Sequence, residues 1–188
     1  MFYLLLCFLY VLYFLALLYY IKLIVNFISC RGKEPPFISS FGKVKKETIN
    51  EARKVLRENP KIKVTDLGCG TGCLLIPLAK EFKNSKFVGY EYDWFAYLIA
   101  KIRTFYIPNI VIYKKNFLEE DLREYDLVIG YWIQGLAEKL GNKLNKELNK
   151  TAVIISEIFE IPQLKQIKVV ESSLAFKKLN VYIYNPNK

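Results

Sequence analysis

The sequence predicts an α/β fold: a mostly parallel seven-stranded sheet with helices on both faces and a C-terminal β-hairpin, preceded by one transmembrane helix. Apolar strand-like runs alternate with helical segments between residues 61 and 159, which is typical of a parallel sheet covered by helices. The strand-like runs 166–176 and 180–186 are separated by only a few residues, as in a hairpin. Residues 2–21 carry no charge and are long enough to cross a bilayer.

The N-terminal segment is the first element. As a helix its 20 uncharged residues span ~30 Å, the thickness of a bilayer's hydrocarbon core. Cleavage is the alternative, as a signal peptide or before Cys30, but the segment lacks a basic start and no A-x-A site follows it. Residues 1–30 are therefore predicted to be a single-pass membrane anchor. Basic residues follow the span between positions 31 and 46, so the positive-inside tendency predicts a domain on the cytoplasmic side.

A linker and one folded domain come next. Residues 31–42 contain two prolines, two glycines and paired serines, which indicates a linker, and residues 43–188 form the domain. The predicted helices have apolar residues near helical spacing, and the predicted strands are nearly continuous apolar runs. In chain order the elements are a helix over 44–59, a strand over 61–67, a helix over 72–82, a strand over 86–91, a helix over 93–106, strands over 109–114 and 125–132, a helix over 135–148, a strand over 151–159 and the hairpin.

Composition restricts the partners and the chemistry. With 28 Lys plus Arg against 18 Asp plus Glu, the formal charge is +10, which suits nucleic acid, anionic lipid or an acidic protein. Most of the excess is scattered lysine on predicted helix faces, with no Arg-rich arm, which argues against a nucleic-acid partner. Histidine is absent, and Cys69 and Cys73 are too few for zinc, so no metal site is predicted.

A glycine-rich loop joins the strand 61–67 to the helix 72–82. Its spacing is D-x-G-x-G-x-G, and the loop residues predicted to contribute to a cofactor site are Asp66, Gly68, Cys69, Gly70 and Gly72. The dinucleotide fingerprint G-x-G-x-x-G places its third glycine one position later. A carboxylate two residues before the first glycine repels a pyrophosphate but suits a cofactor with ammonium and sulfonium groups. S-adenosyl-L-methionine carries both and is the predicted cofactor.

A second carboxylate ends the next strand. Glu91 follows Gly72 by 19 residues, where an acidic side chain can accept hydrogen bonds from both hydroxyls of a ribose. Taken alone, Asp66 could cap the loop and Glu91 could be an ordinary strand-end charge. Together they lie at the ends of adjacent parallel strands, where ligands of open sheets bind, and this favours a cofactor site.

The order of elements and the loop, over residues 43–184, resemble the class I (Rossmann-like) S-adenosylmethionine-dependent methyltransferases. The resemblance implies that Asn116, where that family usually has Asp, accepts a hydrogen bond from the adenine amino group. It also implies that Tyr131 and Trp132 face the transferred methyl group and are the catalytic aromatic residues. Packing against the next helix is the alternative role for both.

A narrower resemblance combines the single span with the stretches "EPPFISSFGK", "DLGCGTG" and "VGYE" and the helix 135–148. Together they look like the small membrane-anchored protein-lysine methyltransferases, whose mitochondrial members modify the ADP/ATP carrier and the ATP synthase c-subunit. This implies a protein-lysine N-methyltransferase that acts on a membrane-associated protein with an accessible lysine. A lipid or other small-molecule methyltransferase at the membrane, an RNA methyltransferase and an inactive binding module are the alternatives.

Overall fold

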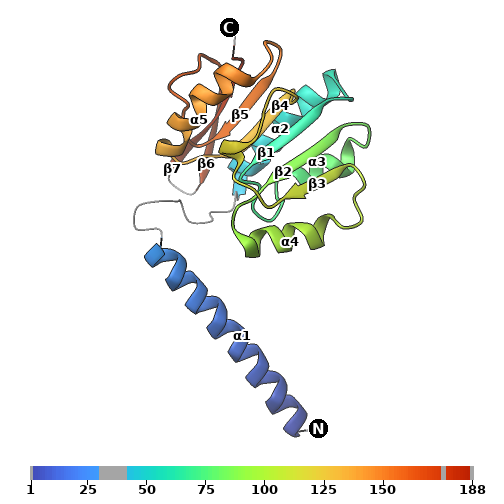
Figure 1. The fold of residues 1–188 in the computed structure, drawn as a ribbon, viewed down its shortest axis with the longest axis vertical. Helices are drawn as coiled ribbons and strands as arrows, with labels where there is room; N and C mark the ends of the chain where they lie inside the picture. The colour runs from blue at the N-terminus through green and yellow to red at the C-terminus, as the bar shows by residue number, and fades with distance from the viewer. Residues whose placement is uncertain (1, 30–41, 175–176, 187–188) are drawn as a thin grey trace. The chain divides into compact units, whose positions relative to one another are not determined.

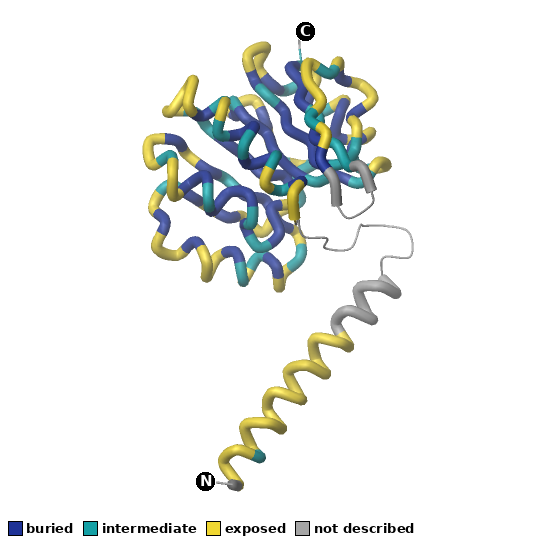
Figure 2. Tube along the Cα trace, turned by 180° about the vertical axis from the view of Figure 1, so that it is seen from behind, coloured by how far each residue is buried: buried dark blue, intermediate teal, exposed yellow. Residues whose placement is uncertain are grey.

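The structure is a computed structural model that describes residues 2–29, 42–174 and 177–186 (Figure 1). The chain divides into two compact units, residues 1–37 and 38–188. The first contains α1 (Phe2–Ser29), whose described side chains are almost all exposed (Figure 2). Among the described residues, one helical stretch, Tyr3–Ile21, is long and apolar enough to cross a membrane. The predicted linker, residues 31–42, lies outside the described residues except for its last position and stays a prediction.

The second unit, here called the α/β domain, is built on one sheet. Its described residues form a seven-stranded sheet in the order β3-β2-β1-β4-β5-β7-β6. The strands are β1 (Lys63–Leu67), β2 (Lys86–Tyr90), β3 (Ile110–Tyr113), β4 (Leu127–Tyr131), β5 (Val153–Glu157), β6 (Gln166–Leu174) and β7 (Lys177–Tyr184). The first five pair in parallel, whereas β7 pairs antiparallel with both β5 and β6. The predicted mostly parallel sheet with a C-terminal hairpin is confirmed.

Helices cover both faces of this sheet, as predicted. The helices of the α/β domain are α2 (Gly42–Glu58), α3 (Leu75–Glu81), α4 (Trp94–Thr104), the short 3-10 helix η1 (Phe117–Glu119) and α5 (Gln134–Glu147). The buried apolar residues of α2 and α3, together with Ala100 of α4, belong to one apolar cluster, and the buried alanine and leucines of α5 belong to another. The short helix η1 was not predicted, because three residues are too few to show a period.

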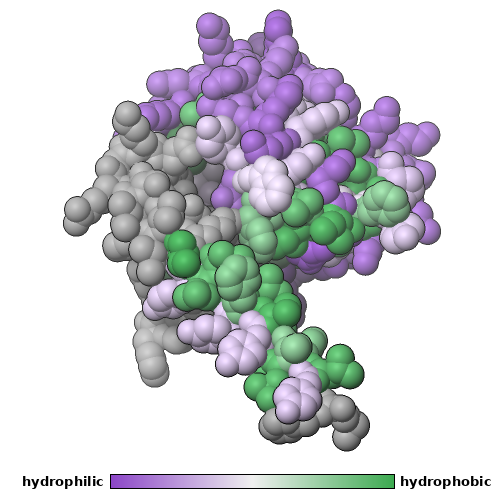
Figure 3. All heavy atoms as spheres, turned by 60° about the horizontal axis from the view of Figure 1, so that its bottom comes forward, coloured by the Kyte–Doolittle hydropathy of each residue, from purple (hydrophilic) through white to green (hydrophobic). Residues whose placement is uncertain are grey.

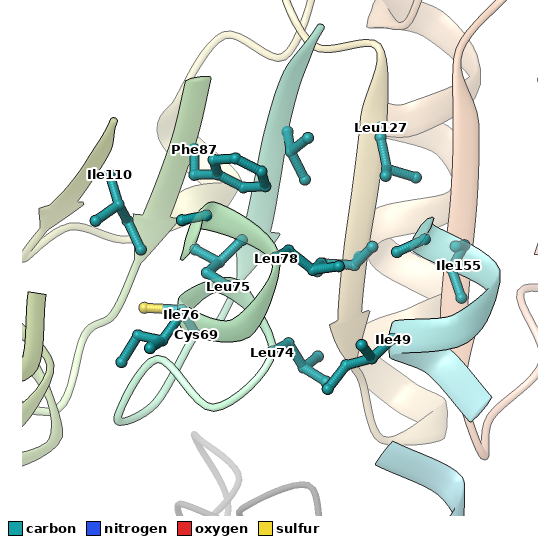
Figure 4. Close-up of a cluster of buried hydrophobic side chains, with 14 of the residues drawn as sticks. Ile49, Cys69, Leu74, Leu75, Ile76, Leu78, Phe87, Ile110, Leu127 and Ile155 are labelled. Atoms are coloured by element: carbon teal, nitrogen blue, oxygen red, sulfur yellow. The ribbon is translucent and has the colours of Figure 1, made fainter. Parts of the chain in front are cut away.

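The two apolar clusters lie on opposite faces of the sheet. Successive strand residues point to opposite faces, so Leu127 and Ile129 of β4 join the cluster of α3, while Val128 between them joins the cluster of α5. Figure 4 shows the first cluster, in which Leu78 and its neighbours on α3 pack against the sheet. Every buried residue of both clusters lies at Val44 or later. The α/β domain therefore buries its described core without α1 and can fold on its own.

The carboxyl ends of the parallel strands define the edge that carries the predicted site. Helix α2 precedes β1, helix α3 follows it, and both pack along the sheet. The C-terminal part of α2 meets the C-terminal end of α3, where Arg53 Nε contacts Glu81 Oε2 at 2.7 Å. At the other edge, marked by the arrowheads in Figure 4, Ile49 of α2 lies beside Leu74. The first residue of α2, Gly42, therefore lies toward the same edge as the glycine-rich loop.

Candidate active site

The glycine-rich loop directly follows β1 and has an unusual backbone. Gly68, Gly70 and Gly72 have φ values of 93°, 55° and 77°, in the left-handed region that residues with a Cβ rarely adopt. The N–H groups of Gly68 and Cys69 both donate to the Tyr90 carbonyl at 2.9 Å. The backbone thus needs glycine at all three positions, and the loop is fixed to the end of β2.

Asp66 lies on β1 and is the most unusual polar residue of the site. It pairs in register with Gly89 of β2 and Ile129 of β4, and it is only 2% exposed. Its Oδ1 atom has no hydrogen-bond partner among the described residues. Burial, and then the charges of Glu157 and Glu91, raise the pKa of this carboxyl well above its ordinary value. A buried carboxylate in this setting is costly, and a cationic ligand would offset the cost.

Glu91 follows β2 and holds the loop from the other side. Its Oε2 accepts the Gly70 N–H at 2.7 Å, and its Oε1 accepts the Asp93 N–H at 2.7 Å. Burial raises its pKa, while these N–H donors act in the opposite direction. A carboxylate has roughly four acceptor sites, so each oxygen can still accept a bond from a ligand. The structure therefore brings Asp66, Glu91 and the glycines together at one edge of the sheet.

Cys69 packs beneath the loop. It is buried, and a Cβ at Gly89 of β2 would lie 2.7 Å from its Sγ. Burial raises the pKa of the thiol well above its ordinary value. The side chain of Cys69 therefore fills space between the loop and β2, as a small apolar residue would.

Asn116 lies beyond β3, on the same edge as Glu91. The Glu91 N–H donates to the carbonyl of Tyr113, the last residue of β3, at 3.0 Å. Asn116 caps η1: its Oδ1 accepts the Leu118 N–H at 3.1 Å, and its Nδ2 donates to Glu119 at 2.9 Å. Its side chain is half-buried and keeps acceptor capacity on Oδ1.

Tyr131 and Trp132, at the end of β4, have different surroundings. Tyr131 is half-buried, and its ring meets that of Phe159 edge to face at 5.6 Å between centroids. Burial, and then the charge of Glu157, raise the pKa of Tyr131. Trp132 is 0% exposed, and its Nε1–H donates to the Leu67 carbonyl at 2.7 Å. This burial favours the packing role for Trp132, whereas Tyr131 keeps part of its ring open.

Two further residues reach the site without having been predicted from the sequence. Glu157 ends β5 opposite Tyr131 in register and is buried; an acidic residue at the end of an apolar strand was the available signal. Arg103 of α4 donates to the Thr71 carbonyl of the loop at 2.7 Å, a contact between distant positions that no local pattern indicates. Among the described residues, no group of three or more acidic, cysteine or histidine side chains could hold a metal ion.

Comparison with known proteins places this arrangement in a family. Residues 66–168, more than half of the chain, match the ANTKMT methyltransferase domain. The chain belongs to this family. A Protein-lysine N-methyltransferase of Saccharolobus islandicus is 32% identical over 124 residues, which cover 64% of the chain and 77% of that protein.

Solved structures support the fold of the ANTKMT-family domain. An RNA methyltransferase from Salinibacter ruber, solved with S-adenosyl-L-homocysteine, superposes with a TM-score of 0.66 over 79% of the chain and 93% of its own, at 18% identity. A precorrin-6y C5,15-methyltransferase from Geobacter metallireducens has a TM-score of 0.60 over 82% of the chain and 93% of its own, at 13% identity. At these identities the likeness shows the class I methyltransferase fold, which the sequence predicted.

Proposed function

We propose that the protein transfers a methyl group from S-adenosyl-L-methionine to a lysine of a membrane-associated protein. The observation that supports this cofactor is the environment of the Asp66 carboxyl. Its buried Oδ1 has no hydrogen-bond partner among the described residues, and two further carboxylates lie near it. A cationic ligand fits such a position. Membership of the ANTKMT family and the relative named Protein-lysine N-methyltransferase support the reaction and the substrate class.

Each predicted site residue has a role in this proposal. The Asp66 carboxylate accepts hydrogen bonds from the cofactor's ammonium group, and Glu91 accepts them from the ribose hydroxyls. The glycines let the backbone approach the cofactor closely, because no Cβ lies in the way. The Asn116 amide oxygen accepts a hydrogen bond from the adenine amino group. When bound, the cofactor supplies an electrophilic methyl group on a sulfonium centre.

The substrate side of the site must position an amine and keep it neutral. In-line transfer depends mostly on positioning the nucleophile, and a lysine loses its charge more readily where it is desolvated. We place Tyr131 in this role, because its half-open ring at the end of β4 can line a slot for the lysine side chain. The buried Trp132 indole holds the end of β4 in place, because its Nε1–H donates a hydrogen bond to the Leu67 carbonyl.

The anchor completes the proposal. We propose that α1 spans the membrane once, with the α/β domain on the cytoplasmic side. The 12 residues 30–41 between α1 and α2 reach at most ~40 Å when fully extended. Such a tether raises the effective concentration of membrane-bound targets without any new contact. The preferred substrate lysine is therefore on a protein at the membrane.

The test compares the full chain with a chain that lacks residues 2–30. Methylation of a short lysine peptide should be nearly unchanged, whereas methylation of the intact target in membranes should fall by about tenfold or more. Mass spectrometry of membrane and soluble fractions, from cells with and without the gene, identifies the methyl-lysines. Methyl-lysines lost only from soluble proteins would contradict the anchor's role. Transfer of labelled methyl to extracted lipid or RNA, with none to protein, would favour the alternative classes.

A further inference from the structure

Helix α4 buries its small residues and exposes its large apolar ones. Its buried positions are Ala96, Ala100 and Thr104, spaced four apart along the face that packs on the sheet. The outer face and the following turn carry a row of large side chains, defined here as the α4 stripe: Trp94, Leu98, Ile102, Phe105 and Tyr106. Trp94 is 61% exposed, Ile102 67% and Phe105 77%. A helix that packs only on its own domain would have the opposite pattern.

The α4 stripe lies in a part of the chain without negative charge. Residues 94–118 contain no Asp or Glu, and the basic residues among them are Lys101, Arg103, Lys114 and Lys115. Lys115 pairs with Glu120 at 2.9 Å, and Lys101 and Lys114 are exposed. In Figure 3, which brings the lower side of the Figure 1 view forward, much of the green and near-white surface belongs to α1, and a smaller group of such side chains lies on the visible face of the α/β domain among purple ones.

This composition fits the surface of an anionic bilayer better than a protein groove. Trp, Tyr and Phe with aliphatic residues on one helix face, flanked by lysine, are typical of helices that lie in the membrane interface. Each nearby basic residue adds attraction to anionic headgroups. The chain also brings a bilayer within reach, because residues 30–41 join α2 to the apolar helix α1. This last step rests on the anchor in the proposed function.

We propose that the α4 stripe docks the α/β domain on the surface of an anionic lipid bilayer. This docking surface lies beside the glycine-rich loop, because Arg103 of α4 donates to the Thr71 carbonyl at 2.7 Å and to Thr71 Oγ1 at 3.1 Å. Docking through α4 therefore holds the glycine-rich loop close to the bilayer. The tether limits how far the domain can move away, and the stripe fixes which side faces the lipid.

The two tryptophans of the chain give a direct assay. Trp94 lies in the α4 stripe, and Trp132 is fully buried in the α/β domain. A chain of residues 38–188, which contain the described core, is titrated with two kinds of vesicle: one of neutral lipid only, the other with about a third anionic lipid. Both are made with brominated acyl chains, which quench tryptophan fluorescence. Anionic vesicles should quench the fluorescence of Trp94 and shift it to the blue. Trp94→Phe, which leaves only Trp132, should show neither change.

A matched pair of substitutions tests the surface itself. Ile102→Glu adds a negative charge to the α4 stripe and should weaken vesicle binding by about tenfold or more. Ile167→Glu makes the same change at an exposed isoleucine of β6 and should leave binding unchanged. Equal binding by both variants, or equal quenching by neutral and anionic vesicles, would overturn the proposal.

The assay also separates docking from its competitors and from the proposed function. If light scattering shows a dimer that Ile102→Glu dissociates, while vesicles are not bound, the stripe is an interface between two copies and the proposal fails. Calorimetry with S-adenosyl-L-methionine should give the same affinity for Ile102→Glu and the unsubstituted domain. Loss of vesicle binding with intact cofactor binding supports docking, whereas a domain that binds vesicles but no cofactor leaves docking standing and contradicts the proposed function.

Discussion

Replacing Asp66 by Asn tests the cofactor assignment most sharply, because the two side chains have nearly the same shape. The Asp66 carboxyl is 2% exposed, and its Oδ1 has no hydrogen-bond partner among the described residues. In the proposed complex its charge pairs with an ammonium group away from water. A hydrogen bond to a charged group contributes ~1.5–3 kcal/mol, so Asp66→Asn should weaken cofactor binding by about 10- to 150-fold. Calorimetry on residues 38–188 measures this affinity.

The same substitution should raise the stability of the ligand-free domain at neutral pH. The folded pKa of Asp66 is raised above its unfolded value by burial and by the charges of Glu157 and Glu91. The folded state therefore binds more protons than the unfolded state, and stability falls as pH rises from the unfolded towards the folded pKa. Asparagine cannot ionise and avoids that loss. Thermal denaturation without cofactor should show a higher midpoint for Asp66→Asn.

Asp126 provides the matched control for both measurements. It lies at the opposite end of β1, where its Oδ2 accepts the Lys63 N–H at 2.9 Å. Asp126→Asn should leave cofactor affinity unchanged and should not stabilise the domain. If Asp66→Asn binds the cofactor as tightly as the unsubstituted domain, the ammonium assignment is wrong. If it also lowers the midpoint, then Asp66 is a structural cap of the loop.

Three more predictions concern the same edge. Cofactor affinity should rise with pH through the raised pKa of Asp66, because the bound cation favours the ionised carboxyl, and calorimetry across pH should lose this dependence in Asp66→Asn. Glu91→Ala should weaken cofactor binding by ~1–3 kcal/mol in the same assay. Gly130→Ala places a Cβ 2.7 Å from the Trp132 ring and should destabilise the domain by ~1–3 kcal/mol in urea denaturation. Gly135→Ala, with nothing within 4 Å of its Cβ, should not.

Periodicity and strand-like patterns were enough to predict every helix and strand of the α/β domain except η1, and the remaining errors lie at element ends. The helix predicted over 72–82 begins at Leu75, because the left-handed backbone of Gly72 and the turn after it delay the first helical residue. The strand predicted over 125–132 spans only Leu127–Tyr131: the Tyr125 N–H donates to the Leu122 carbonyl in a turn before it, and the Trp132 side chain after it donates to the Leu67 carbonyl. Such ends depend on tertiary contacts that a local pattern does not contain.

The site could be predicted only where its residues share a local motif. The glycines and Asp66 follow one another in sequence, and Glu91 ends the next strand, so spacing and topology were sufficient to group them. Glu157 joins them only because β5 lies next to β4 in the sheet. The same limit applies to Arg103, which contacts a residue 32 positions earlier. Contacts that depend on the order of strands in a sheet, or on the reach of long side chains, are not contained in a local sequence pattern.

The α4 stripe shows what a hydrophobic pattern leaves open. The segment from Trp94 to Thr104 is rich in apolar residues and correctly predicts a helix, but it does not say which face is buried. Ala96 and Ala100 let the helix lie close to the sheet, and the larger side chains are then left outside. Since those side chains add little to the described core, stability of the isolated domain does not account for them. An apolar surface that is costly to expose to water is typical of a site that a membrane or a partner covers. The α4 stripe also lies beside the glycine-rich loop, which the proposed reaction needs at the membrane.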